Sequence, residues 1–166
     1  MNQKICLFPD PVLRKPAAPV RHFNNQALKD LVNHLDSVMR AQAMGIGIAA
    51  PQLGIRQAVA IVDVSSRVPG AHRIVLINPV ILELREPKIS REGCMSLPEY
   101  TANVLRYDWV RYRCQGIEGQ ISERISLGIE AVCVQHEADH LQGYLFFDRV
   151  MSLKTDMLPR LLRRRK

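Results

Sequence analysis

The segment Gln135-His136-Glu137-Ala138-Asp139-His140 is the most informative part of this 166-residue sequence, and it lies in a predicted helix over residues 127–141. At about 100° per residue, His136 and His140 lie one turn apart on the same face of that helix. The line between them coincides with the direction of Ile129. The two imidazoles therefore continue the inward, apolar stripe of the helix.

Two histidines at positions i and i+4 can bind one divalent metal ion, each through a ring nitrogen at about 2.1 Å. Glu137 follows the first histidine and can reach a water molecule at the metal rather than the metal itself. Random placement of the histidines and glutamates of this chain predicts about 0.007 copies of the pattern. The alternative is a pair of core histidines that only make hydrogen bonds, and the spacing favours a metal site.

A metal site needs a third protein ligand, and the sequence indicates that this ligand lies upstream of the helix. In one class of protease a third histidine follows six residues after the second, but that position is Phe146 here. Another class uses a downstream glutamate, and this chain has none after Glu137. Two later carboxylates stay open as ligands, although they match neither class: Asp148 and Asp156.

Two cysteines are candidates for the upstream side of the site. Cys133 lies one turn before His136, and three collinear side chains cannot surround one ion, so we expect Cys133 to line a wall beside the metal. Cys94 lies in Glu92-Gly93-Cys94-Met95-Ser96, where the glycine permits an unusual backbone and the thiol can bind as a thiolate. Together with the histidine helix, Cys94 is the best candidate for the third ligand.

Length and composition predict one soluble domain over residues 1–166. The chain is 47% hydrophobic and 23% charged, which excludes disorder, and no apolar run approaches the roughly 20 residues of a membrane helix. The four cysteines form no Cys-x-x-Cys pair, which predicts reduced thiols. The N-terminus lacks a secretion signal, so we expect a cytoplasmic protein, with an organelle form left open.

Strands outnumber helices and do not alternate with them, which favours the α+β class. Residues 1–23 carry four of the ten prolines and predict an extended, irregular arm. An apolar stripe predicts a helix from Asn24 or Asn25 that ends at Gly45. The other predicted elements are strands at 58–63, 73–78, 80–84, about 100–114, 121–125 and 144–147, and a short helix from Ser152 that Pro159 interrupts.

Three motifs resemble those of the peptide deformylase family, in the same order and spacing. They are Gly45-Ile46-Gly47-Ile48-Ala49-Ala50-Pro51-Gln52 for Gly-x-Gly-x-Ala-Ala-x-Gln, Glu92-Gly93-Cys94-Met95-Ser96 for Glu-Gly-Cys-x-Ser, and His136-Glu137-Ala138-Asp139-His140 for His-Glu-x-Asp-His. The opening Phe8-Pro9-Asp10-Pro11-Val12-Leu13-Arg14 is also similar to family N-termini. The likeness extends from near the start of the chain to about residue 150.

The resemblance implies antiparallel strands wrapped around the motif helix, and hydrolysis of the formyl group from the N-terminal formyl-methionine of new proteins, with release of formate. It also implies one divalent ion, Fe²⁺ in cells and Zn²⁺, Ni²⁺ or Co²⁺ as substitutes in purified protein. The implied metal ligands are Cys94, His136 and His140, and the implied general acid/base is Glu137. The Gln52 amide and the Met95 N–H would stabilise the oxyanion, and Gly45 to Gly47 would offer backbone groups to an extended peptide.

Further residues complete this hypothesis. An apolar pocket for the methionine side chain is expected from Ile46, Ile129, Val132 and Cys133, with plain core packing an equal alternative for Ile129. Arg106 or another arginine is the candidate partner for Asp139, since a buried carboxylate needs one. Some family members carry an arginine that covers the peptide where this chain has Thr101, so peptide affinity or site closure is expected to differ.

Two other functions stay open from the sequence. One is a metal-dependent endopeptidase that uses the same histidine helix. The other is a catalytically inactive relative that binds RNA or the ribosome through its basic tail at about 152–166. The formal net charge is +7, and five positive charges lie in the last seven residues: Arg160, Arg163, Arg164, Arg165 and Lys166. The sequence does not determine the oligomeric state.

Overall fold

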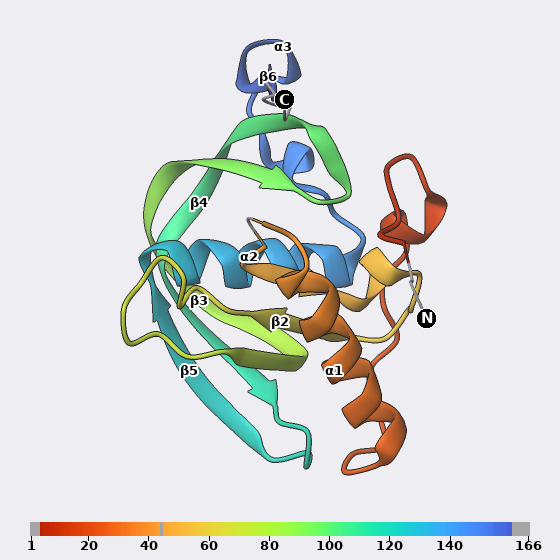
Figure 1. Cartoon of the computed structure of the whole chain (residues 1–166). Coiled ribbons are helices and arrows are strands. Elements are labelled where there is room, and N and C mark those ends of the chain that lie inside the picture. The colour runs from red at the N-terminus through yellow and green to blue at the C-terminus, as the bar shows by residue number, and fades with distance from the viewer. Residues whose placement is uncertain (1–3, 44, 161–166) are drawn as a thin grey trace.

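Antiparallel strands wrap around one central helix, which confirms the α+β prediction (Figure 1). The computed structural model describes residues 4–43 and 45–160. The central helix is α2, Gly128–Gln142, and it ends at Gly143, whose φ of 81° suits a glycine. The basic residues at positions 163–166 lie outside the described residues.

Five strands follow one another across the sheet in chain order, and each pairs antiparallel with the next. They are β1 (Gly47–Ala49), β2 (Val59–Val62), β3 (Ile74–Cys94), β4 (Leu97–Gln115) and β5 (Ile121–Leu127). A sixth strand, β6 (Met157–Pro159), pairs with β4. The predicted strands at 73–78 and 80–84 form parts of β3, because register shifts near Ile77 and Ile81 let the pairing with β4 continue.

Helix α1, Gln26–Arg40, lies beside β1 and β2 and begins as predicted. Asn25 caps it, and its side-chain oxygen accepts a hydrogen bond from the Leu28 N–H at 2.9 Å. The buried stripe is Leu28, Leu31, Val32, Leu35 and Met39. The helix ends before the predicted Gly45, since the next position on that stripe is the exposed Gln42.

The predicted strand at 144–147 is wrong, because this segment enters a 3-10 turn, Phe146–Arg149. The Asp148 carboxylate accepts a hydrogen bond from the Leu145 N–H at 2.7 Å and closes that turn locally. After it come the short helix α3, Leu153–Asp156, and then β6. The predicted final helix is therefore only one turn long. Two further 3-10 turns are Pro11–Arg14 in the N-terminal arm and Ala50–Leu53 after β1.

The core lies on both sides of the sheet and holds α2 in place. One buried cluster joins α2 to β1, β2, β3 and β4, with Tyr112 and Val134 among its members. A second cluster joins α1 to β1, β2 and the Ala50–Leu53 turn. No helix in the described part of the chain is both long and apolar enough to cross a membrane. The packing fixes the histidine-bearing helix at the centre of the fold.

Candidate metal centre

Helix α2 and the end of β3 bring three ligand-type side chains together. One ligand atom from each of Cys94, His136 and His140 lies within 4.8 Å of the others. The Cys94 Sγ and the His140 Nε2 are 3.2 Å apart. Cys94 and His140 are buried, and His136 is partly exposed. The structure therefore joins the helical pair to the upstream cysteine, across more than 40 residues of sequence.

The other candidate ligands lie elsewhere. Asp148 pairs with Arg14 and caps its own turn, and Asp156 accepts a hydrogen bond from the Ser152 N–H at 2.9 Å. Phe146, at the position of a third histidine in one protease class, stacks on the His136 ring with centroids 6.3 Å apart. Among the described residues, the Cys94 cluster is the one group that could hold a metal ion.

The surroundings of Cys94 favour its thiolate. Burial raises the pKa of the thiol, but the charges and hydrogen bonds of His140 and His136 outweigh this and hold it well below the ordinary value. The Ser96 N–H and the Gln52 amide also donate hydrogen bonds to the sulfur, at 3.4 and 3.5 Å. A thiolate and two imidazoles are a donor set that suits Fe²⁺ or Zn²⁺. The residues present therefore fit a divalent ion.

Glu92 fixes the orientation of the first histidine. The His136 Nδ1 lies 2.8 Å from the Glu92 Oε2. Burial raises the pKa of Glu92, but hydrogen bonds and charge from His136 and Arg106 lower it to about 2, so the carboxylate is ionised. An ionised carboxylate only accepts hydrogen bonds, so the Nδ1 must carry the proton. A metal ion binds the neutral form of the ring, which would then present its Nε2 lone pair to the ion.

Arg106 links this carboxylate to a second one on α2. Its guanidinium donates to Glu92 at 2.7 and 3.1 Å and to Asp139 at 2.6 Å, which confirms the predicted pairing with Asp139. Arg149 donates to the same aspartate at 2.7 and 3.2 Å. Arg106, Glu92 and Asp139 are all buried. This network ties β3, β4 and α2 together directly behind the metal cluster.

Replacing Arg106 by alanine is expected to lower the free energy of unfolding by about 3–5 kcal/mol, because Glu92 loses a buried partner and Asp139 keeps only Arg149. Urea unfolding measures the loss. Arg111→Ala is the matched control, since Arg111 on the same strand pairs with Glu83 and Glu123 near the surface. Equal losses for the two variants would contradict the role of the buried network.

Glu137 is buried beside the cluster and is set up to exchange protons. Burial raises its pKa to about 7, even though the nearby histidines lower it. Its Oε2 has no hydrogen-bond partner among the residues that the structure describes. β1 can approach it only because residue 47 is glycine: a Cβ there would meet the Glu137 Oε1 at 2.4 Å and the Cys133 Sγ at 2.6 Å.

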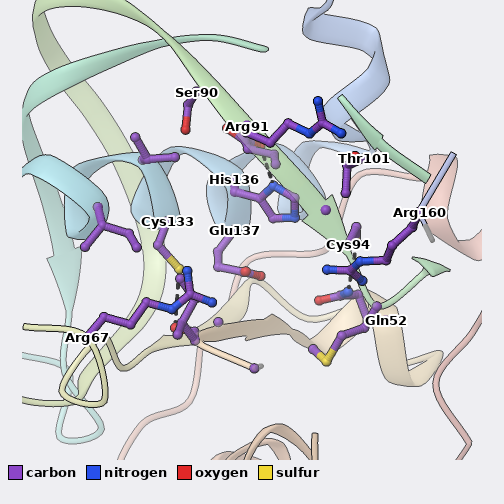
Figure 2. Close-up of a pocket in the computed structure, with 18 residues that line it drawn as sticks. Gln52, Arg67, Ser90, Arg91, Cys94, Thr101, Cys133, His136, Glu137 and Arg160 are labelled. Carbon is purple, nitrogen blue, oxygen red and sulfur yellow. Dashed lines mark hydrogen bonds and ion pairs between the residues drawn. The ribbon is translucent and has the colours of Figure 1, made fainter. Parts of the chain in front are cut away.

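Gln52 follows β1 and directs its amide group toward the cysteine. The Ala49 N–H donates to the Gln52 Oε1 at 2.9 Å, which leaves the amide NH₂ facing Cys94 and the Ser96 hydroxyl, the latter at 3.2 Å. In Figure 2, Gln52, Cys94, His136 and Glu137 converge on one region of the pocket. An N–H donor therefore lies next to the three ligand-type side chains.

A pocket of about 360 Å³ opens over these groups. Its wall includes all the residues predicted to contact substrate: Gly45, Ile46, Gly47, Ile129, Val132 and Cys133, together with Met95. The Cys133 thiol donates to the Ile46 carbonyl at 3.3 Å, and burial raises its pKa well above the ordinary value. Cys133 is therefore a neutral thiol in the pocket wall, as its helix position predicts.

Several residues of the site have no role predicted from the sequence. Glu92 lies two residues before Cys94 on β3 and so faces the same side, but no strand is predicted at these positions. Four other pocket-lining side chains have no signal in the sequence: two lie on β3 just before Glu92, and two reach the pocket from other segments. They are Arg67, Ser90, Arg91 and Arg160. Thr101 also lines the pocket, and its hydroxyl donates to the Leu158 carbonyl at 3.4 Å.

Comparison with known proteins gives one consistent result. The sequence model of the family described as Polypeptide deformylase matches residues 2–156. A peptide deformylase of Acidobacterium capsulatum is 39% identical over 164 residues, which are 99% of this chain and 95% of that protein.

Solved structures agree with the sequence comparison. The crystal structure of peptide deformylase from Thermotoga maritima has a TM-score of 0.82 at 37% identity, covering 90% of this chain and 98% of that one. The Met-Ala-Ser-bound class I type b peptide deformylase from Acinetobacter baumannii has a TM-score of 0.84 at 32% identity, covering 90% and 99%. Sequence and fold therefore agree over almost the whole chain.

Proposed function

This chain belongs to the peptide deformylase family, and we propose how its own residues remove the N-terminal formyl group from new polypeptides. The family makes it a metal-dependent hydrolase. The observation that carries the residue assignment is the buried Cys94, His136 and His140 cluster, which lies beside Glu137 at the base of a pocket. We assign the metal to the first three residues and proton transfer to the fourth.

The bound cation would act as a Lewis acid, which lowers the pKa of a water molecule enough for it to lose a proton near neutral pH. Glu137 takes that proton, because a base works best when its pKa is close to the working pH. Its own pKa of about 7 meets this condition. The oxygen of the deprotonated water then attacks the carbon of the formyl group. When the carbon–nitrogen bond breaks, Glu137 returns the proton to the leaving amine, and formate departs.

The attack turns the formyl oxygen into an oxyanion, which needs hydrogen-bond donors. The Gln52 amide supplies one donor, since its carbonyl end is occupied by the Ala49 N–H and its NH₂ faces Cys94. We assign the second donor to the backbone N–H of Met95, the residue directly after Cys94. Donors that are already oriented stabilise the developing charge without rearranging.

Replacing Gln52 by alanine is expected to lower kcat by about 10²- to 10³-fold while KM changes little, because this donor acts mainly in the transition state. Steady-state rates of formate release measure both constants. Gln57→Ala serves as the control, since Gln57 lies on the same connection but outside the pocket. A rise in KM with unchanged kcat would instead assign Gln52 to substrate binding.

The substrate is proposed to bind as an extended strand beside Gly45 to Gly47. β1 is at the edge of the sheet, since it pairs with β2 alone, and an edge strand can hydrogen-bond an added peptide. The methionine side chain is assigned to the apolar wall formed by Ile46, Ile129, Val132 and Cys133. Methionine is unbranched and flexible, so a pocket of small and branched side chains can enclose it.

The direct test is to incubate the purified protein with formyl-Met-Ala-Ser and, separately, with casein. We expect formate release and no casein cleavage. Casein cleavage without formate would support the endopeptidase instead, and activity on neither would support the inactive relative. Neither alternative is favoured, because the family match covers nearly the whole chain and all the assigned groups are present together.

We propose Fe²⁺ as the resident ion in cells, with Zn²⁺, Ni²⁺ or Co²⁺ able to replace it during purification. The thiolate and two imidazoles support a divalent ion of this group without selecting one of them. Metal analysis of protein purified without oxygen tests this proposal. Iron at about one ion per chain is expected, and zinc alone would contradict it.

We also propose that the protein acts in the cytoplasm on formyl-methionyl nascent chains, with an organelle form still open. A weak contact of the basic C-terminus with the ribosome or RNA is a further proposal, supported by the charges at positions 163–166. Co-sedimentation with ribosomes at low and raised salt tests it. Binding that is unaffected by neutralising those four residues would contradict it.

A further inference from the structure

Arg160, near the C-terminal end of the described chain, forms part of the pocket wall (Figure 2). Its guanidinium lies against Gly93, the residue directly before Cys94. A Cβ on Gly93 would meet the Arg160 Nη2 at 3.0 Å, so the glycine leaves the space that the guanidinium occupies. A residue more than 60 positions away in sequence therefore lies next to the metal cluster.

The backbone of β6 fixes this placement. Strand β6 pairs antiparallel with β4, with Tyr100 opposite Pro159 and Thr101 opposite Leu158. The Arg160 N–H then donates to the Glu99 carbonyl at 2.7 Å. The Met157 side chain packs against the buried cluster that contains Cys94. The arginine is therefore attached to the sheet at the edge of the site and is not part of a free tail.

The guanidinium charge of Arg160 has no partner among the residues that the structure describes. Among residues 4–43 and 45–160, the Arg160 side chain makes no hydrogen bond or ion pair. The nearby Glu92 is already bonded to Arg106 and His136. An arginine side chain is always charged and carries five N–H donors. A charged donor group that lines a binding pocket and has no internal partner is available to a ligand.

We propose that Arg160 is a substrate-binding residue, whose guanidinium donates hydrogen bonds to backbone carbonyl oxygens of the peptide beyond the formylated methionine. This rests on the proposed function. Gly45 to Gly47, the end of β3 and Arg160 line the same pocket, so a peptide bound there with its formyl group at the cluster can reach the guanidinium. Carbonyl oxygens are present in every sequence, which suits an enzyme that acts on many different chains.

The test compares Arg160→Ala, Arg160→Lys and the control Lys154→Ala, in the full chain with its metal. With formyl-Met-Ala-Ser, Arg160→Ala is expected to raise KM by about 10-fold or more with kcat within about twofold. Arg160→Lys should recover part of the loss, since it keeps a charged donor. Lys154, an exposed cation on α3, should behave as wild type.

Two further measurements separate substrate binding from other roles of Arg160. Metal content and the midpoint of thermal unfolding should match wild type in all three variants, and a loss of either in Arg160→Ala would indicate a structural role instead. The carboxamide formyl-Met-Ala-Ser-NH₂ should show the same rise in KM. An effect confined to the free acid would mean that the guanidinium pairs with the terminal carboxylate of a short peptide, which overturns the proposal.

Failure of this inference is distinct from failure of the proposed function. If wild-type protein releases no formate, the deformylase assignment itself is wrong. If wild type is active and Arg160→Ala has an unchanged KM, only the role of Arg160 is wrong.

Discussion

The Glu137→Gln variant is expected to lose about 10²- to 10⁴-fold in kcat for formate release while it keeps its divalent ion. Glutamine has nearly the same shape as glutamate, but it cannot take a proton from water or return one to the amine. The metal should remain, because Glu137 lies outside the group of side chains that could hold it. Rate measurements and metal analysis on the same preparation test both parts.

Glu130→Gln is the matched control. Glu130 is on the same helix, where the Ser126 hydroxyl donates to its carboxylate at 2.6 Å, and it lies outside the pocket. The control should keep near wild-type activity. If Glu137→Gln also stays active, proton transfer belongs to another group. If Glu137→Gln loses its metal as well, the carboxylate is a ligand, and the separation of metal binding from proton transfer is wrong.

The parts of this site that the sequence predicts correctly are local. His136 and His140 are one helical turn apart, so their shared face follows from helix geometry alone. Gly143 ends the helix because its φ of 81° is easy for glycine, and this signal is also local. Cys94 is a partial case: its role as a metal ligand follows only when its motif is considered together with the distant histidines.

The sequence misplaces strands in two segments, one because of pairing with a distant strand and one because of a local hydrogen bond. The strands predicted at 73–78 and 80–84 are one strand, because pairing with β4 continues across the register shift between them. At 144–147 the composition predicts a strand, but the segment leads into a turn that the Asp148 side chain closes. In both cases a hydrogen-bond partner, rather than residue type, decides the backbone.

Arg160 shows the same limit at the level of function. It is one of five basic residues near the end of the chain, and the sequence predicts only a basic tail from all five. Its position in the pocket arises from the pairing of β6 with residues near Thr101. By contrast, Arg106 was predicted to pair with Asp139 because a buried carboxylate needs a partner, and that physical requirement holds wherever the partner lies.

Replacing Cys94 by alanine is expected to remove the divalent ion and formate release together. The variant loses the thiolate and leaves two imidazoles on one helix, which cannot surround an ion. Replacing a residue that only hydrogen-bonds a metal ligand weakens metal binding by up to about 100-fold. Loss of a direct ligand should weaken it by more than that. Metal analysis after gel filtration, with activity measured on the same fractions, tests this expectation.

Cys114→Ala separates the loss of a ligand from the loss of a buried thiol. Cys114 is also buried, in the core formed by α2 and β4, and lies outside the pocket. Cys114→Ala should keep its metal, and only Cys94→Ala should lose it. Together with Glu137→Gln, which keeps metal and loses rate, they form a decisive set. Retention of metal by Cys94→Ala would remove the thiolate from the site and with it the link between β3 and α2 on which the mechanism depends.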